Sequence, residues 1–458
     1  MNEMTPQLSD HRQQAMSYLQ GLPEGDGCWL MDQRQAALSR FTELGFPDSR
    51  QEAWRYSSVE GLLQQGFVVL DADRDIAEHK IQSEFLTEPV AGRLVFVDGL
   101  LQPELSDAVS LPGVRLTGLR GAMAAADRPM LEALGFLSGS GDHAFSALNL
   151  ATMQDGALIR LAANTELERP IELLHVATGA AEGRSLRPRH LIMLEEGASA
   201  TLVERYISLD ECGYFNNLVC EIVLAERARL RHLRVQQESR KAYHLSELYI
   251  ALQADAHYEG ANAATGGMWT RSKINNRFIA AGASCELDGI YLAGNGQLTD
   301  FHLDVDHAVP GCISRENFKG IINGKGRAVF DGRILVAQDA QQTDAQLSND
   351  NLMLSRSAEV DTKPQLEIFA DDVKCSHGTT VGEIDSNMLF YLQSRGIPRG
   401  QAVQMLCQGF AEDYQLRPAA GDRCVIDLVF AHVGTGQAAL AFAAREAREE
   451  AYSPVVGW

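Results

Sequence analysis

The residues best suited to chemistry lie in the stretch ADDVKCSHGTTVGEID, residues 370–385, where the thiol of Cys375 and the imidazole of His377 stand two positions apart. Side chains two apart on a β-strand face the same side, so this thiol and imidazole would project together. Such a pair suits soft-metal or sulfur chemistry, because an imidazole can be a neutral ligand at neutral pH. A polar corner between two kinds of structure is the more frequent origin of Cys-x-His pairs, so the residues alone leave both interpretations open.

A second polar stretch, TDFHLDVDHAVPGC, gathers a mixture of side chains that could ligate a metal: Asp300, His302, Asp304, Asp306, His307 and Cys312. Strand alternation also places His302, Asp304 and Asp306 together on one solvated face, and this simpler interpretation is favoured. The sequence contains no Walker-type phosphate loop, G-x-S-x-G elbow, H-E-x-x-H motif or nucleotide-binding G-x-G-x-x-G. It therefore gives no support to the common hydrolase, ATPase and dehydrogenase classes.

The composition is that of a globular protein with room for two or three domains, because 45% of its 458 residues are hydrophobic. A net charge of -21 repels nucleic acid phosphates and anionic membrane surfaces, so we expect protein or small-molecule partners, with no nucleic acid and no membrane. The polar N-terminus and the lack of a membrane-length apolar run predict a cytoplasmic protein. Eight dispersed cysteines without a C-x-x-C pair predict reduced thiols, and any metal ligands would come from distant parts of the chain or from another chain.

The elements that must position these residues change along the chain from helix to strand and back to helix. Helical spacing in QRQAALSRFTELGF, followed by a mixed region, predicts an N-terminal helical and mixed domain over residues 1–140. Short strands rich in Val, Ile and Leu dominate a core over residues 141–380. Two helices joined at Gly396-Ile397-Pro398, and one further helix in TGQAALAFAAREAREEAY with charges clustered at its end, predict a C-terminal helical domain over residues 381–458.

The strand-rich region contains a repeat. Four stretches align on a small residue that follows a turn, with steps of 30, 28 and 27 residues between Ala198, Ala228, Ala256 and Ala283. This is the period that successive coils of a β-solenoid need. The likeness of CELDGIYLAG to AVFDGRILVA breaks the period, because Ala328 follows Cys285 by 43 residues. A β-sandwich therefore remains an alternative, although few Asn-Gly or Asp-Gly pairs stand where two-residue hairpins would need them.

Longer motifs follow one another along almost the whole chain: GFPDSRQEAWRYSS, LERPIELLH, DHAVPGCISRENFKGII, GKGRAVFDGRILVAQDAQQTDAQLSNDNLMLS, and TKPQLEIFADDVKCSHGTTVGEID followed by LFYLQSRGI. Together they resemble the SufB/SufD family of the SUF iron-sulfur cluster assembly system. The resemblance implies a mainly β fold, a right-handed parallel β-helix flanked by N-terminal and C-terminal helical domains. SufB-like members carry a cysteine where this chain has Asn349, so it resembles the SufD members. The tail from about residue 418 to 458 does not match the family pattern.

The resemblance also implies a function. The chain would be a non-enzymatic scaffold that acts in a complex with a SufB-like subunit and a SufC-like ABC ATPase. His377, as a metal-binding or sulfur-handling residue supported by Cys375, would take part in forming a transient iron-sulfur cluster at the interface with the SufB-like subunit. The C-terminal helical pair would dock the ATPase subunit through Leu389, Phe390, Leu392, Arg395, Gly396, Val403, Leu406 and Phe410. Whether this chain ligates the cluster or only passes it, flavin involvement, the stoichiometry and a homodimer of the isolated chain stay open.

A β-solenoid enzyme acting on a polysaccharide or an acyl substrate is the alternative function, because other β-helices do such chemistry. A glycan-active solenoid should line one face with paired carboxylates and aromatic side chains. Aromatic residues make up only 7% of this chain, and no acidic pair recurs from coil to coil. The composition therefore favours the scaffold.

Overall fold

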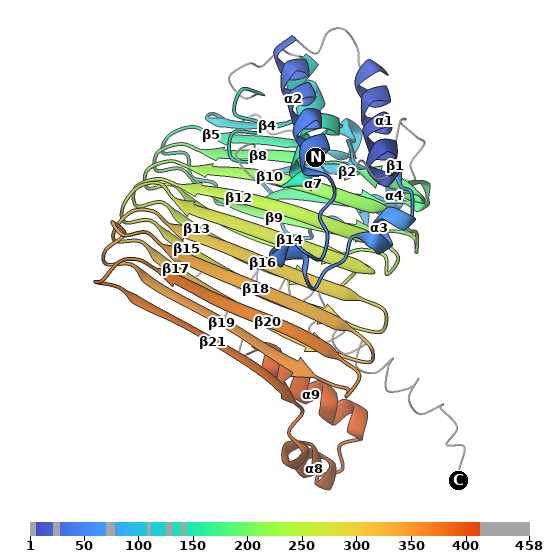
Figure 1. Cartoon of the computed structure of the whole chain (residues 1–458), viewed down its shortest axis with the longest axis vertical. Helices are drawn as coiled ribbons and strands as arrows, with labels where there is room; N and C mark the ends of the chain where they lie inside the picture. The colour runs from blue at the N-terminus through green and yellow to red at the C-terminus, as the bar shows by residue number, and fades with distance from the viewer. Residues whose placement is uncertain are drawn as a thin grey trace.

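The chain forms a long solenoid of β-strands with helices at both ends (Figure 1). The computed structural model describes residues 6–21, 28–69, 78–107, 111–124, 131–138 and 143–412. Packed together at the N-terminal end are α1 (Pro6–Gly21), α2 (Cys28–Leu44) and α7 (Ala144–Thr152), and after the last strand come α8 (Ser386–Ser394) and α9 (Arg399–Glu412). The shorter helical elements are η1 (Glu52–Trp54), α3 (Glu60–Gln64), α4 (Glu78–Gln82), η2 (Pro103–Leu105), α5 (Leu119–Ala124) and η3 (Gly179–Ala181).

The strands belong to two sheets. Sheet A runs, in spatial order, through β20 (Glu359–Ile368), β18 (Arg327–Val336), β16 (Leu298–His307), β14 (Trp269–Phe278), β12 (Tyr243–Leu252), β10 (Phe215–Leu224), β8 (Arg189–Leu194), β5 (Ala157–Leu161) and β4 (Val114–Gly118), with β7 (Arg184–Leu186) and β1 (Val68–Val69) beside this path. Sheet B runs through β21 (Lys374–Glu383), β19 (Asp344–Met353), β17 (Ile313–Ile322), β15 (Ser284–Ala293), β13 (His257–Ala264), β11 (Arg229–Gln237), β9 (Ser199–Ser208), β6 (Ile171–Ala177), β2 (Gly92–Val97) and β3 (Leu100–Leu101).

The connectivity is that of a parallel β-helix. From β8 to β21, consecutive strands alternate between the two sheets, and each strand pairs in parallel with the strand two further along the chain. Each coil therefore contributes one strand to each sheet. This confirms the predicted β-helix and excludes the β-sandwich, whose sheets are built from antiparallel strands. Strands β2 and β4, which lie within residues 1–140, extend the two sheets at their N-terminal end.

The repeated alanines mark the corner at which each coil enters sheet B. Each is fully buried and directly precedes a strand: Ala198, Ala228, Ala256 and Ala283 precede β9, β11, β13 and β15. The coils are tied at this corner by backbone bonds, such as the 2.8 Å bond from the amide of Arg229 to the carbonyl of Ala198. Cys312 and Thr343 take the same position in the next coils. The other likeness breaks the period because Cys285 lies in sheet B whereas Ala328 lies in sheet A.

One apolar core fills the space between the sheets, and large side chains of one coil use space left by small residues of the next. A Cβ atom on Gly289 would lie 2.1 Å from the ring of Phe318, which stands beside it in the register of β15 and β17. This interior continues to the last coil, where Cys375 packs against it. Strand alternation and the register with β19 fix which side chains of β21 face inward.

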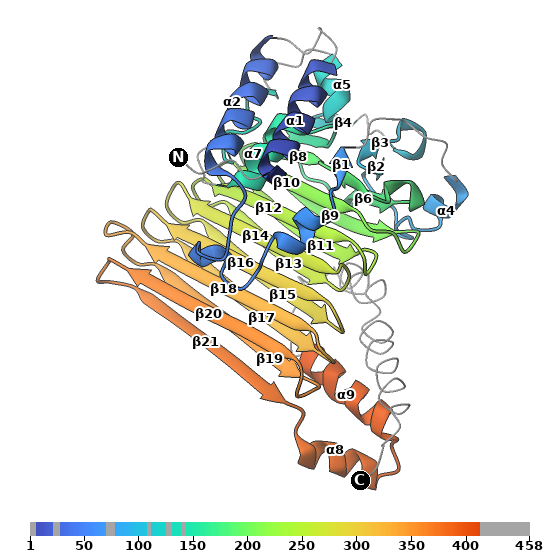
Figure 2. The same cartoon turned by 45° about the vertical axis from the view of Figure 1, so that its right-hand side comes forward.

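The segment after α2 crosses the outer face of sheet A. Trp54 stacks on the guanidinium of Arg271 at 3.9 Å, and the carbonyl of Ala53 accepts a 2.8 Å hydrogen bond from the same group. Glu52, two residues before Trp54, forms an ion pair with Lys363 in the last coil of the solenoid. This segment therefore links the N-terminal helices to the opposite end of the solenoid (Figure 2). No helix in the described ranges has both the length and the apolar character needed to cross a membrane.

Candidate functional site

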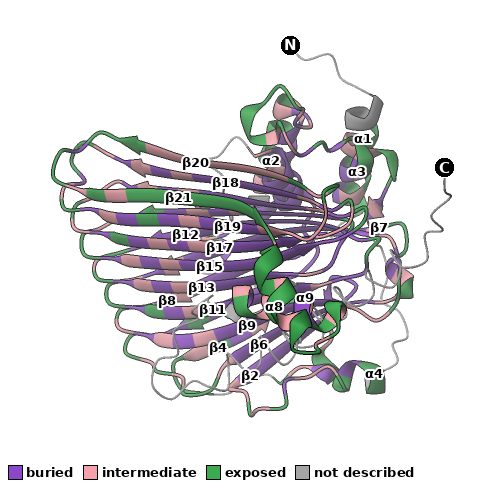
Figure 3. Ribbon diagram, turned by 90° about the horizontal axis from the view of Figure 1, so that it is seen from below, coloured by how far each residue is buried: buried purple, intermediate pink, exposed green. Residues whose placement is uncertain are grey.

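The last coil is the open end of the solenoid. In the described part of the chain, β20 and β21 are the final strands of sheets A and B, and each pairs with a neighbour on one side only. Nine of the ten residues of β21 are exposed, as Figure 3 shows from below. The edge of β20 carries Lys363 and Pro364, which are residue types that hinder strand addition, whereas β21 contains no proline. The edge of β21 is therefore the more open to pairing.

Cys375 and His377 both lie on β21, at positions that face the interior of the solenoid. The register aligns Cys375 with Ala345 and His377 with Leu347, and both of these β19 residues are buried in the core. Since no coil follows β21 among the described residues, Cys375 is only half-buried and His377 is exposed. By contrast, Cys212, Cys220, Cys285, Cys312 and Cys407 are buried. This combination leaves one thiol and one imidazole on the same face of the uncovered coil.

The electrostatic setting of the two side chains differs. Partial burial raises the pKa of the Cys375 thiol, and the nearby carboxylates of Asp344 and Glu316 raise it further, so it stays protonated at neutral pH. Within the described residues, His377 makes no hydrogen bond or ion pair, and no group of three or more His, Cys, Asp or Glu side chains is arranged to hold a metal ion. His377 could contribute one nitrogen ligand to a metal or cluster whose other ligands come from elsewhere.

A ladder of polar side chains supports β21 from inside, and sequence reasoning missed it. Asn349 donates a 3.0 Å hydrogen bond to the hydroxyl of Tyr291 and accepts one of 2.9 Å from Thr362. The hydroxyls of Thr362 and Thr379 are 3.0 Å apart, which joins the two strands of the last coil. In the sequence, Asn349 stands out only because SufB-like members carry a cysteine there. The signal for its role was that the amides Asn349 and Asn351 continue the inward-facing positions of Ala345 and Leu347 in β19.

Helices α8 and α9 follow the open coil. The carboxylate of Asp385 caps α8 by accepting a 2.8 Å bond from the amide of Asn387, and Gly396 takes a positive φ of 85° at the turn before α9. None of the side chains of α8 is buried, and Phe390 is 72% exposed. A short helix with exposed apolar side chains is typical of a docking surface.

The residues that were predicted to bind the ATPase subunit divide into two groups. Val403 and Phe410 pack towards sheet B, beside the buried Cys407, which contacts Leu292 and Ile321. Leu389, Leu392 and Leu406 are half-buried, whereas Phe390, Arg395 and Gly396 are exposed. Arg395 lies 5.1 Å from the ring centroid of Tyr391, which holds its guanidinium along α8. The first group therefore anchors α9 to the sheet, and the exposed side chains of α8 form the free surface.

The second polar stretch of the sequence, residues 299–312, does not form a metal site in the described residues. On the outer face of β16, Asp300 forms an ion pair with Arg271, and His302 is buried beside it, so the prediction of a solvated face is wrong for His302. The segment after α2 covers this part of the sheet, as the hydrogen bond from Ser57 to Asp300 shows. His307 and Cys312 are buried, and His307 approaches Ser314 at 3.0 Å.

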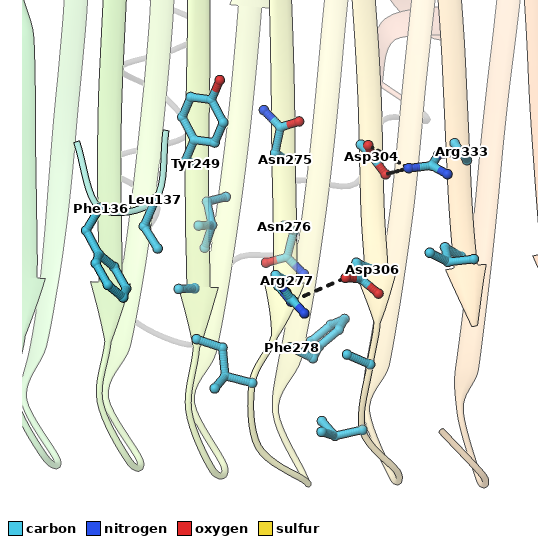
Figure 4. Close-up of a pocket in the computed structure, with 16 residues that line it drawn as sticks. Phe136, Leu137, Tyr249, Asn275, Asn276, Arg277, Phe278, Asp304, Asp306 and Arg333 are labelled. Carbon is cyan, nitrogen blue, oxygen red and sulfur yellow. Dashed lines mark hydrogen bonds and ion pairs between the residues drawn. The ribbon is translucent and has the colours of Figure 1, made fainter. Parts of the chain in front are cut away.

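Asp304 and Asp306 line a cavity of about 780 Å³ on the outer face of sheet A (Figure 4). Both carboxylates are held by arginines: Arg333 donates two 2.9 Å bonds to Asp304, and Arg277 lies 3.3 Å from Asp306. A glycosidase needs one carboxylic acid to donate a proton and one free carboxylate to attack or activate water. Two carboxylates paired with guanidinium groups do not supply that set, so the cavity gives no support to the alternative enzyme.

Comparison with known proteins identifies a family that the sequence of this chain matches. Residues 176–410 match the family described as "SUF system FeS cluster assembly, SufBD core domain", and residues 9–173 match "SufBD protein N-terminal region". The chain is 33% identical to the iron-sulfur cluster assembly protein SufD of Escherichia coli, over 90% of this chain and 94% of the relative. It is 32% identical to a SufBD family protein of Synechocystis, over 83% and 86% of the two chains, and 32% identical to one of Mycobacterium tuberculosis, over 58% and 66%.

Proposed function

The chain belongs to the SufBD family of the SUF iron-sulfur cluster assembly system and is of the SufD type, and on this premise we propose that it is a non-enzymatic scaffold whose open coil docks a SufB-like subunit. The observation that carries this proposal is the uncovered strand β21, which presents Cys375 and His377 on one face. An exposed edge strand can accept a strand from another chain through its free backbone groups. Pairing along β21 would bring the partner's side chains next to His377.

The cluster itself is the product carried by this assembly, and we propose that it forms transiently at this interface. His377 would offer an imidazole nitrogen, a ligand type that suits iron, while the remaining ligands come from the partner. Cys375 would play a supporting part, because its thiol is half-buried and its pKa is raised, so little thiolate is present at neutral pH. The proposed site is complete only in the complex.

The experiment co-expresses the chain with its SufB-like and ATPase subunits and measures complex formation, iron and acid-labile sulfide. His377→Ala should leave the complex intact and strongly lower the cluster content, and Cys375→Ser should have a milder effect. Ser376→Ala is the matched control, because Ser376 is exposed on the opposite face of the same strand. Wild-type cluster content in His377→Ala would overturn the assignment of this site.

We further propose that α8 and α9 dock the ABC ATPase subunit, with the exposed apolar side chains of α8 as the contact. Phe390→Asp should weaken binding of the ATPase subunit by at least about tenfold, as loss of an aromatic anchor does. Gln393→Asp adds the same charge to an exposed position of the same helix and should bind nearly normally. Both variants should keep the unfolding temperature of the wild type, because α8 has no buried side chain. If the two variants bind the ATPase subunit with equal affinity, α8 is not part of the interface.

A further inference from the structure

The cavity on the outer face of sheet A contains two arginine–aspartate pairs that are built differently (Figure 4). Arg333 donates a 2.9 Å bond to each carboxylate oxygen of Asp304. Arg277 approaches Asp306 only through Nε, at 3.3 Å, and its side chain is 70% exposed. Within the described residues, the two terminal nitrogens of Arg277 make no hydrogen bond. The first pair is therefore closed, whereas the second, which we call the open pair, has donors left for a ligand.

The surroundings of the open pair also provide acceptors. Asn275 precedes Arg277 by two residues on β14, so both side chains face the cavity. The amide nitrogen of Asn275 donates a 3.3 Å bond to the carbonyl of Leu248, which leaves its amide oxygen available. Partial burial raises the pKa of Asp306, although Arg277 opposes this. A half-buried carboxylate has lost part of its hydration, so a cationic group of a ligand would stabilise its charged form.

The other walls of the cavity are apolar and include large exposed side chains. Phe136 is 77% exposed, and Ile279 is exposed at the other end of the cavity. The loop that carries Phe136 is fixed on sheet A, because the amides of Gly135 and Leu137 donate bonds of 2.9 and 3.0 Å to the buried carboxylate of Glu221. Volumes between about 300 and 1,000 Å³ are usual for sites that bind small molecules. The cavity, at about 780 Å³, has the size and the mixed lining of such a site.

The charges in the cavity indicate the class of ligand. Among the described residues that line it, the charged side chains are those of the two pairs, so their formal charges cancel. A polyanion such as a nucleotide would be repelled by Asp304 and Asp306, and a simple cation by Arg277 and Arg333. A ligand that carries a carboxylate and an ammonium group side by side matches the adjacent charges of the open pair. Its remaining part would have to be apolar to lie against the other walls.

From this geometry we propose that the cavity binds a free α-amino acid with a large apolar side chain. The terminal nitrogens of Arg277 donate to the carboxylate of the ligand, in the fork geometry that guanidinium groups favour. The ammonium group of the ligand donates to Asp306 and to the amide oxygen of Asn275. The apolar side chain packs between Phe136 and Ile279. The inference does not depend on the proposed function, because that function concerns the edge of sheet B and helices α8 and α9.

Ligand-observed NMR titration of the full-length chain tests this, with L-phenylalanine, L-leucine and L-tryptophan as probes. N-acetyl-L-phenylalanine lacks the ammonium group and L-phenylalanine amide lacks the carboxylate. Each derivative should bind at least about tenfold more weakly than L-phenylalanine, because one charged hydrogen-bonding partner is lost. L-alanine should also bind more weakly, because it has no large apolar side chain. Failure of all three probes to bind, or equal affinity for L-phenylalanine and both derivatives, would overturn the proposal.

Two variants of the open pair and one matched control locate the binding. Arg277→Gln should weaken binding of L-phenylalanine at least about tenfold and remove its advantage over the amide derivative, and Asp306→Asn should remove its advantage over the acetyl derivative. Arg327→Gln is the control, because Arg327 pairs with Asp361 on the same sheet but does not line the cavity. It should bind L-phenylalanine like the wild type. Unchanged affinity in Arg277→Gln, or an equal loss in Arg327→Gln, would overturn the proposal.

Discussion

Two histidines occupy the same inward-facing column of sheet B, yet their surroundings make them chemically different. The register runs from His232 in β11 through Gly260, Leu287, Glu316 and Leu347 to His377 in β21. His232 is enclosed by coils on both sides and is fully buried, whereas in the described part of the chain His377 has a coil on one side only. The position in the column sets where a side chain points, and the presence of a further coil decides whether it can meet a partner.

Enclosure also determines the charge that each part of the column can hold. Burial lowers the pKa of His232, although its 2.6 Å bond to Glu204 opposes this, and a 3.1 Å contact with Tyr258 uses its other ring nitrogen. Arg234 and His232 together outweigh the burial of Glu204 and hold the pKa of that carboxyl well below its usual range. The early coils are therefore a closed, internally paired polar interior. Within this column, His377 of the last coil is the exposed side chain that can meet another molecule.

The largest effect should come from breaking the enclosed network. Glu204→Ala removes the carboxylate that faces Arg234 at 3.3 Å and leaves a buried guanidinium without its partner, so we expect a loss of about 3 to 5 kcal/mol in the free energy of unfolding. Denaturant unfolding measures this loss. Glu226→Ala is the matched control, because Glu226 pairs with Arg227 at the exposed surface and should cost less than about 1 kcal/mol. Equal costs for the two variants would contradict an enclosed, paired interior.

Glu316, in the middle of the column, should make stability depend on pH. Burial raises its pKa to about 8, with smaller opposing effects from Ser314 and Arg315. The folded state therefore holds this proton more tightly than the unfolded state, so its contribution is fully present below about pH 4.5 and is lost as the pH rises towards 8. Glu316→Gln cannot ionise, so relative to the wild type it should gain about 3 to 5 kcal/mol between pH 4 and pH 9.

The measurement for Glu316 is denaturant unfolding of both proteins at several pH values. The control is Glu286→Gln, because Glu286 lies on the outward face of β15 and is only half-buried. Its stability difference from the wild type should stay nearly constant with pH. A constant difference for Glu316→Gln as well would show that the carboxyl ionises freely, and the column would then be less enclosed than its burial indicates.

A smaller effect is expected where the interior reaches the open coil. Asn349→Ala removes the hydrogen bonds to Tyr291 and Thr362 and should cost about 1 to 3 kcal/mol. Because these bonds hold the last coil, amide hydrogen exchange should accelerate in β21 more than in β9. Asn317→Ala, on the outward face of β17, should change neither quantity appreciably. If Asn349→Ala leaves amide exchange in β21 unchanged, the hydrogen bonds of Asn349 do not stabilise the open coil.

The periodic part of this structure could be predicted from the sequence, whereas the contacts between residues remote in sequence could not. The corner alanines and the pairing of Cys375 with His377 on one face follow from local spacing, and both could be predicted. The burial of His302 could not, because the segment that covers it comes from the region of Ser57, which is remote in sequence. The exposure of His377 depends on the number of coils, which no residue near His377 encodes.

The candidate functional surfaces also combine features that could be predicted from the sequence with features that could not. Apolar spacing in α8 and α9 predicted two helices, yet it could not tell that Val403 and Phe410 pack towards sheet B while Phe390 stays exposed. Asn349 was noticed for the cysteine that it replaces, whereas its bonds to Tyr291 and Thr362 join residues of three different coils. Such roles depend on register between distant strands, and that register is set by the whole solenoid.

The smallest stability effect should be found at the open end of the column. His377→Ala should change the free energy of unfolding by less than about 0.5 kcal/mol, because an exposed side chain without hydrogen bonds in the described residues contributes little packing. Leu347→Ala, one coil inward in the same column, should cost about 2 to 5 kcal/mol because it leaves a cavity in the core. Denaturant unfolding of the isolated chain compares the two variants directly. If His377→Ala costs as much as Leu347→Ala, something already covers the last coil, and a site that opens only to an incoming partner could not lie there.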